Sequence, residues 1–284
     1  MLGPFRKFAA MQCIPLIDHT SLNDNDSEES IRAFCDAALM APQRCATIIV
    51  YPQFITQVYE ILQKASNGRN CIRVGSVVNF PLGNDPLDKV IEDTRKVVEM
   101  GVDEIDMVVD YQKLLSNREE GLADTFKLVT NVKRFCVART TNPHIQPLHA
   151  FPPVTLKVIL ETGKLQDAEL IDTVATLLLE AGADFIKTST GKVEVNATID
   201  TSRIMLLALK RFLDKYPEKK GTVGFKAAGG LKTLDQAIEY VLLAQEILGA
   251  SFIQKNFRFG ASSLLKLFLK ELQGDHGDKI TGQY

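Results

Sequence analysis

Short runs of apolar residues alternate along the chain with longer segments in which apolar residues recur at helical spacing. The apolar runs are continuous, which is typical of strands that are buried on both faces. This alternation of strand and helix indicates a parallel sheet covered by helices, the α/β class. The pattern predicts strands at residues 14–18, 46–50, 72–79, 104–109, 155–161, 184–188, 222–226 and 256–260.

Two of the intervening helices are clearly marked. In the first, Asp85 is a suitable N-cap, Pro86 suits the first helical position, and apolar residues follow at helical spacing until Gly101. The second is predicted from residue 167 to residue 181, and Gly182 ends it. Each glycine is followed by an acidic residue and an apolar strand, which suggests a repeated helix–strand unit.

The number of units favours a closed barrel. Eight units in about 250 residues average about 30 residues each, as in a (β/α)8 TIM barrel. We therefore predict one barrel domain over residues 1–284. The alternative is an open doubly wound sheet, but the chain has neither of the usual glycine-rich nucleotide motifs. Residues 139–153 are predicted to be an exposed insertion, and residues 274–284 a flexible tail.

Composition narrows the function classes. The 33 Lys and Arg nearly balance the 35 Asp and Glu, giving a net charge of -2, so we expect neither nucleic acid nor a membrane surface as a partner. The five cysteines are scattered, which favours reduced thiols in a cytoplasmic protein. No apolar stretch is long enough to span a membrane, and the four histidines show no metal-binding spacing.

Four ionisable residues lie where predicted strands end: Asp18, Asp106, Lys187 and Lys226. The C-terminal ends of barrel strands converge on one face, and the alternation of side chains turns Asp106 and Lys226 inward if their apolar neighbours face the helices. A buried lysine beside a second cation has a lowered pKa and can form a Schiff base. Spacing alone leaves a second interpretation open, in which each lysine is solvated or held in a salt bridge.

Loops rich in small residues follow the last three predicted strands, at residues 188–192, 227–233 and 260–263. Small residues let backbone N–H groups approach an anion, and a helix N-terminus adds positive potential. These loops are therefore a candidate phosphate site, although ordinary tight turns and a serine helix cap would give the same pattern. Lys192 and Lys232 are either phosphate partners or solvated charges.

Several segments resemble the deoxyribose-phosphate aldolase family of class I, Schiff-base aldolases, from residue 14 to the C-terminus. They are DHTSLND at 18–24, GVDEIDMVV at 101–109, LKVILETG at 156–163, KTSTGK at 187–192, VGFKAAGG at 223–230 and FRFGASSLL at 257–265. The resemblance implies a TIM barrel that reversibly cleaves 2-deoxy-D-ribose 5-phosphate into glyceraldehyde 3-phosphate and acetaldehyde. It also implies that no metal or organic cofactor is needed and that the protein is a homo-oligomer, a dimer or tetramer.

The resemblance also implies roles by position. Lys187 forms the Schiff base with the C1 aldehyde, Lys226 depresses the pKa of Lys187, and Asp106 relays protons with water. Asp18 is a supporting carboxylate, and Tyr284 matches a C-terminal tyrosine that exchanges a proton with the enamine in some members. The residues matched to the phosphate cradle are Thr190, Gly191, Lys192, Gly229, Gly230, Lys232, Gly260, Ser262 and Ser263.

The chain departs from the family pattern at a few positions. Ala227 stands where proline is common, Lys232 where arginine is common, and Ile49 where some members have cysteine. The insertion at residues 139–153 has no counterpart in compact bacterial members and could bind another protein. Two alternatives follow: a weak or inactive barrel that serves as a protein-binding scaffold, and a Schiff-base aldolase for another phosphosugar.

Overall fold

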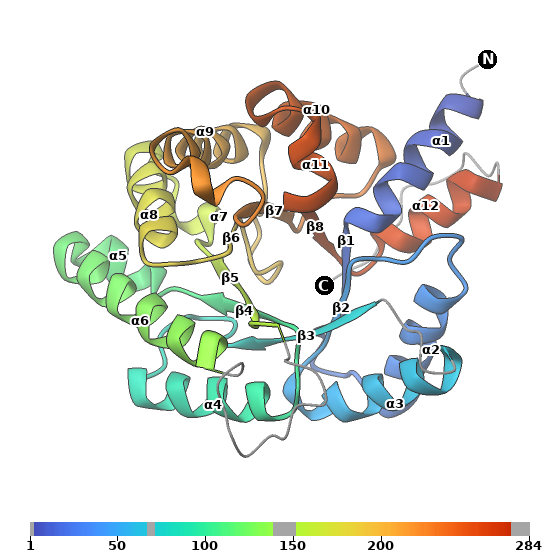
Figure 1. The fold of residues 1–284 in the computed structure, drawn as a ribbon, viewed down its shortest axis with the longest axis horizontal. Helices are drawn as coiled ribbons and strands as arrows, with labels where there is room; N and C mark the ends of the chain where they lie inside the picture. Colours follow the sequence, from blue (N-terminus) through green and yellow to red (C-terminus); the bar gives the residue numbers. More distant parts are fainter. Residues whose placement is uncertain (1–2, 67–71, 139–151, 274–284) are drawn as a thin grey trace.

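A closed barrel of parallel strands forms the centre of the protein, and helices surround it (Figure 1). The computed structural model describes residues 3–66, 72–138 and 152–273. Strands β1 to β8 follow one another around the barrel in sequence order, and β8 pairs with β1. This confirms the predicted (β/α)8 barrel and rules out the open sheet. The strands are β1 (Ile17–Thr20), β2 (Thr47–Ile49), β3 (Arg73–Val78), β4 (Glu104–Val108), β5 (Thr155–Ile159), β6 (Phe185–Lys187), β7 (Gly224–Ala228) and β8 (Phe257–Ala261).

The helices form the outer layer, and the first of them, α1, packs against the last, α12 (Figure 1). Within the described ranges, no helix is both long and apolar enough to cross a bilayer. The helices are α1 (Gly3–Cys13), α2 (Glu28–Leu39), α3 (Ile55–Ser66), α4 (Leu87–Glu99), α5 (Tyr111–Ser116), α6 (Arg118–Ala138), α7 (Thr162–Leu165), α8 (Ala168–Glu180), α9 (Ile199–Lys215), α10 (Leu234–Leu248), α11 (Ala250–Asn256) and α12 (Leu264–Gln273).

Several predicted boundaries differ from the structure, and two of the differences have a clear cause. Residues 14–16 form a 3-10 turn with a proline near its start, so the first strand begins only at Ile17. The prediction of Asp85 as a helix N-cap was wrong, because Pro86 is the cap residue of α4. The Asp85 carboxylate lies 2.6 Å from Lys89 Nζ instead. Helix α8 is confirmed, and the Asp167 side chain caps it by accepting a hydrogen bond from the backbone N–H of Glu169.

The strands bury two different sets of side chains. Residues that point outward are apolar, and they fill the layer between the barrel and the helices; Ile105, Met107 and Phe225 are all fully buried. Residues that point inward include Asp106 and Lys226, which are also fully buried. The inside of this barrel therefore holds an ionic cluster beside apolar residues such as Val77, the register partner of Asp106, while its outside supplies most of the hydrophobic core.

Candidate active site

Asp106 lies at the centre of a cluster of three buried lysines. Its Oδ2 atom is 2.7 Å from Nζ of Lys187 and 2.8 Å from Nζ of Lys226, and its Oδ1 atom is 3.3 Å from Nζ of Lys157. Lys187 and Lys226 are register partners on the neighbouring strands β6 and β7. Strand pairing therefore brings the two predicted lysines to the same carboxylate oxygen.

The second predicted carboxylate, Asp18 on β1, extends the cluster. Its Oδ2 atom is 2.7 Å from Nζ of Lys226 and 2.8 Å from Nζ of Lys157, and its Oδ1 atom is 3.6 Å from Nε of Arg258. Burial acts to raise the pKa of Asp18, but the charges of Lys157 and Lys226 outweigh it and hold that pKa at about 2. Asp18 is thus a permanent anion that contacts two of the lysines.

Lys157 is a site residue that the sequence analysis missed. It contacts Asp18, Asp106 and Glu104, and burial is outweighed by the charges of these carboxylates, so its pKa is raised. Glu104 also accepts hydrogen bonds from Arg73 Nη1 at 2.9 Å and from a threonine hydroxyl on β2. The sequence pattern that could have revealed Lys157 is its position between the apolar residues Leu156 and Val158 of β5. If these neighbours face the helices, alternation turns Lys157 inward.

The number of carboxylate partners distinguishes the three lysines. Lys157 contacts three carboxylates and Lys226 contacts two, whereas Asp106 is the one carboxylate within ion-pair distance of Lys187 among the described residues. Burial lowers the pKa of Lys187 to about 8, with the nearby ammonium groups of Lys226 and Lys157 adding to the effect and Asp106 opposing it. At pH 7 roughly a tenth of Lys187 is then an uncharged amine.

A pKa shift in the same direction keeps Asp106 ionised. Burial acts to raise its pKa, but the charges of Lys157, Lys187 and Lys226 hold the pKa well below its ordinary value. The cluster therefore combines an amine that is partly neutral near neutrality with a fixed carboxylate beside it. This arrangement can attack an aldehyde and can exchange protons with water or substrate.

The glycine-rich loops after β6, β7 and β8 come together at the same end of the barrel. Gly191, Gly229 and Gly230 have φ angles of 89°, 76° and 78°, in the left-handed region that favours glycine. A Cβ atom on Gly229 would lie 2.6 Å from Oδ1 of Asn196. The backbone N–H of Gly229 donates to the carbonyl of Gly260 at 3.2 Å, which joins the loop after β7 to the end of β8.

The other predicted loop residues have different surroundings. Thr190 donates its hydroxyl to Glu161, a buried carboxylate that the sequence analysis also missed and whose pKa is raised by burial. The side chain of Lys192 reaches the loop after β1, where its Nζ is 3.6 Å from Oδ1 of Asp24. Lys232 is exposed. The Thr190 hydroxyl also accepts the backbone N–H of Lys192 at 3.0 Å, so the side chains of Thr190 and Lys192 both already have protein partners.

The predicted small residues at the end of β8 and after it differ from each other. A Cβ atom on Gly260 would lie 2.7 Å from Cε of Lys226, so this glycine makes room for the lysine stem. Ser262 and Ser263 are half-buried at the start of α12, and the Ser263 carbonyl accepts the backbone N–H of Leu267. Tyr284, the tail at residues 274–284 and most of the predicted insertion, residues 139–151, lie outside the described residues.

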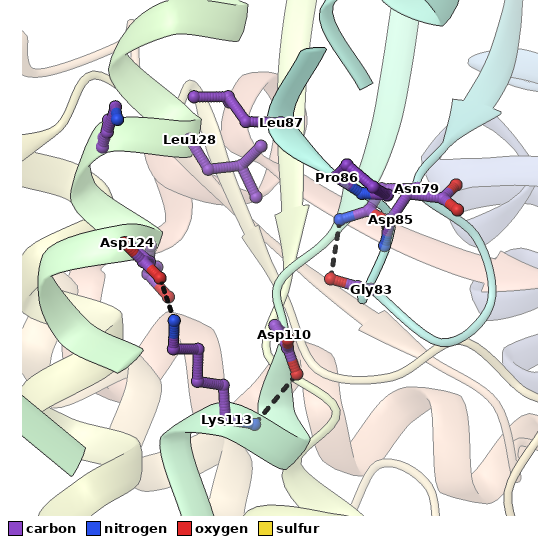
Figure 2. A pocket seen from close by; sticks show the side chains of 11 residues that line it. Asn79, Gly83, Asp85, Pro86, Leu87, Asp110, Lys113, Asp124 and Leu128 are labelled. Atoms are coloured by element: carbon purple, nitrogen blue, oxygen red, sulfur yellow. Dashed lines mark hydrogen bonds and ion pairs between the residues drawn. The ribbon is translucent and has the colours of Figure 1, made fainter. Parts of the chain in front are cut away.

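A separate pocket of about 260 Å³ opens between the loop after β3 and helix α6 (Figure 2). Asn79 donates from its side-chain amide to the carbonyls of Gly83 and Val108, both at 2.8 Å, and so fastens this loop to β4. The side chain of Lys113 extends toward Asp124 and pairs with it (Figure 2). Lys113 and Asp124 of this pocket thus already pair with each other, and none of the clustered lysines lines it.

Metal-binding groups are absent from the described part of the chain, where no three His, Cys, Asp or Glu side chains are grouped to hold an ion. The described cysteines, at positions 13, 35, 45 and 136, are buried and form no disulfide.

A (β/α)8 barrel with a partly neutral, buried lysine amine defines a site suited to Schiff-base chemistry, and comparison with known proteins gives the family. Residues 12–270 match the sequence profile described as DeoC/LacD family aldolase, and the chain belongs to this family.

Solved structures agree with this assignment. A candidate deoxyribose-phosphate aldolase from Toxoplasma gondii ME49 is 26% identical, with a TM-score of 0.84 over 96% of this chain and 97% of that chain. A candidate deoxyribose-phosphate aldolase from Coccidioides immitis is 25% identical, with a TM-score of 0.72 over 92% of this chain and 85% of that chain. The deoxyribose phosphate aldolase of Aeropyrum pernix, described as tetrameric, is 23% identical with a TM-score of 0.64 over 93% and 96% of the two chains, and it supports the fold alone.

Proposed function

We propose that this protein is a class I aldolase that reversibly cleaves 2-deoxy-D-ribose 5-phosphate into glyceraldehyde 3-phosphate and acetaldehyde through a Schiff base on Lys187. The observation that carries the proposal is the contact of Lys187 and Lys226 with one oxygen of Asp106, where Lys187 has the fewest anionic partners and a pKa of about 8. Membership in the DeoC/LacD aldolase family supports it.

The chemistry follows from a partly neutral amine in the barrel. Lys187 adds to the C1 aldehyde and loses water, which gives a protonated imine. The C3 hydroxyl then loses its proton and the C2–C3 bond breaks, so that glyceraldehyde 3-phosphate leaves and the bonding electrons pass to the imine. The resulting enamine takes a proton at C2, and hydrolysis releases acetaldehyde and the free amine. The positive nitrogen is essential, because it alone makes C2 a good leaving group.

Asp106 and Lys226 support these steps in different ways. Since nearby cations hold Asp106 ionised, we expect it to orient the reacting groups and to pass protons through water rather than to keep one. Lys226 adds a positive charge that opposes protonation of Lys187, and Asp18 fixes the position of Lys226 by an ion pair of 2.7 Å. The proposed roles of Asp106 and Lys226 thus follow from the ion pairs that each of them makes.

The loops at the mouth are proposed to bind the substrate phosphate. Gly191 and Gly230 place at the mouth backbone N–H groups that have no backbone acceptor among the described residues, whereas the N–H of Gly229 already donates to Gly260. The start of α12 beside Ser263 adds the positive end of a helix. Lys192 supplies a positive charge. The proton-exchanging role of Tyr284, a homo-oligomeric state, the cytoplasmic location and a protein partner for residues 139–153 stay predictions.

A borohydride trap tests the proposal directly. Acetaldehyde and sodium borohydride are added to the protein, and the modified peptide is mapped by mass spectrometry. We expect the covalent adduct on Lys187, with no adduct in Lys187→Met. Lys7→Met, which removes an exposed lysine far along the chain from the cluster, is the matched control and should be modified like the wild type. An adduct on another lysine, or none, would contradict the proposal.

The substrate is tested separately with phosphosugars supplied side by side. We expect 2-deoxy-D-ribose 5-phosphate to be cleaved with the highest kcat/KM, and unphosphorylated deoxyribose to be cleaved with a much higher KM. If a different phosphosugar is cleaved faster, the proposed Schiff-base chemistry stands and the proposed substrate is wrong.

A further inference from the structure

The opposite end of the barrel, its floor, carries a second cavity. A pocket of about 510 Å³ lies where β3, β5 and β6 begin, and none of the three clustered lysines lines it. Its volume is within the range of small-molecule binding sites, which is about 300–1,000 Å³. Four basic residues border it, Arg73, Lys133, Lys255 and Arg258, and Asp184 is the one carboxylate in its lining. We define these five residues and Phe185 as the floor pocket.

Arg258 is the built-in cation of this pocket. It is only 8% exposed, its Nη1 donates to the carbonyl of Phe257 at 2.9 Å, and its guanidinium lies over the ring of Phe185, 5.6 Å from the centroid. Its Nε is buried without a hydrogen-bond partner among the described residues, and 3.6 Å separate it from Asp18 Oδ1. Because Nε faces Asp18 and Nη1 donates to a carbonyl, Nη2 is the guanidinium nitrogen for which the described residues supply no acceptor and which an anion in the pocket would satisfy.

The remaining charges also favour an anion. Lys133 pairs with Asp184 at 2.6 Å, and the Asp184 carboxylate also accepts the backbone N–H of Leu156 at 2.7 Å. Lys255 is exposed, and Arg73 contacts Glu104 at 2.9 Å. Arg73, Lys133 and Arg258 each face a carboxylate, so Lys255 is the lining cation that has no carboxylate partner among the described residues and is open to an added anion.

We propose that the floor pocket is a second binding site, distinct from the mouth of the barrel, for a small molecule that carries a phosphate group. Arg258 offers a fixed planar donor, and Lys133 and Lys255 offer mobile ammonium groups, which together match the geometry of a phosphate. The ring of Phe185 gives an apolar surface beside the cations for the rest of the ligand. The proposal does not depend on the reaction at the mouth.

A site-resolved titration tests it. Protein labelled with ¹⁵N is titrated with inorganic phosphate, and the backbone amides of Thr222 and Gln254 at the floor are followed together with those of Gly191 and Ser263 at the mouth. We expect saturable shifts at the floor as well as at the mouth. If floor amides stay fixed at phosphate concentrations that saturate the mouth, the proposal is overturned.

Matched variants separate a specific site from general charge. Lys255→Gln and the double variant Lys133→Gln, Lys255→Gln should weaken phosphate binding at the floor by about threefold and about tenfold or more, since each removes a charged contact. The mouth amides should respond as in the wild type, and Lys7→Gln should change neither end. Floor shifts that persist unchanged in both variants would contradict the proposal. Lys255→Gln keeps the test valid if the double variant is destabilised, because Lys255 is exposed.

A second probe defines the source of the phosphate. Adenosine 5'-monophosphate is titrated in the same way as inorganic phosphate. Tighter floor binding of the nucleotide would indicate a phosphomonoester whose body packs on Phe185, and equal binding would indicate recognition of the phosphate alone. Both results support the site. If neither probe shifts the floor amides, the proposal is contradicted.

Discussion

The inward and outward residues of the barrel strands differ in chemistry although they alternate along the same short segments. On β4, Asp106 contacts three lysines, while its neighbours Ile105 and Met107 are fully buried among apolar side chains. Outward burial stabilises the fold in proportion to apolar area, whereas inward burial of charges costs free energy unless they are paired. Outward positions therefore serve mainly the stability of the fold, and inward positions serve the chemistry. Mutations at the two kinds of position should change one property without the other.

The largest effect is expected on the inward face. Lys187→Met removes the amine that forms the Schiff base, so we expect kcat/KM for 2-deoxy-D-ribose 5-phosphate to fall by about 10³-fold or more. Thermal melting should show a folded protein. Steady-state kinetics and a melting curve on the same preparation measure both quantities. Activity above about a hundredth of wild type would break the proposed role.

The matching change on the outward face is Phe225→Ala. Phe225 is fully buried beside Phe257, so truncation should lower the free energy of unfolding by about 3–5 kcal/mol through lost burial and a cavity. Urea unfolding measures this loss. The folded fraction should still form the borohydride adduct, because the next residue along the strand, Lys226, keeps its direction. Loss of trapping without loss of stability would show that the two faces are not separable.

A smaller change in chemistry is expected from Lys157→Met. Lys157 lowers the pKa of Lys187 as a like charge and also neutralises part of Asp106, so its removal should raise that pKa. We expect the pH profile of kcat/KM to move by about one unit toward alkaline pH, with about tenfold less activity at pH 7. A full pH profile tests this, with Lys7→Met as the control. An unchanged profile would assign Lys157 to structure alone.

The smallest effect is a change in how stability depends on pH. The pKa of Lys187 is about 8 in the folded protein and 10.5 ordinarily, so between these values the unfolded chain binds more protons. The contribution of Lys187 to the free energy of unfolding therefore rises with pH in this window, by at most about 1.4 kcal/mol per pH unit. Urea titrations of wild type and Lys187→Met between pH 8 and 10 should differ in slope. Parallel curves would contradict the lowered pKa.

Local patterns predicted much of this molecule from the sequence. Continuous apolar runs located the strands, and side-chain alternation turned Asp106 and Lys226 inward, as the structure has them. The same alternation applies to Lys157, but its contacts with three carboxylates depend on closure of the barrel and on the pairing of Asp106 with Lys157 in register. Such register is set by residues far apart in sequence, which a local pattern does not contain.

Element boundaries and the floor pocket were harder to predict for related reasons. Asp85 has the side chain of an N-cap, but an ion pair with Lys89 competes for its carboxylate. The floor pocket brings Arg73 of β3 together with Arg258 of β8, and their proximity follows only from the closed sheet. The spacing of residues within one segment shows neither which partner a side chain such as Asp85 will choose nor how the sheet closes into a barrel.

Gly260 has a consequence for how this barrel can evolve. The space that any larger residue would need there is filled by Cε of Lys226 on the neighbouring strand. A Cβ atom at position 260 would also lie 2.9 Å from Cβ of Ala228, so even an alanine there requires neighbouring atoms of β7 to shift. Because ion pairs with Asp18 and Asp106 hold Nζ of Lys226, substitutions at positions 260 and 226 are expected to be coupled.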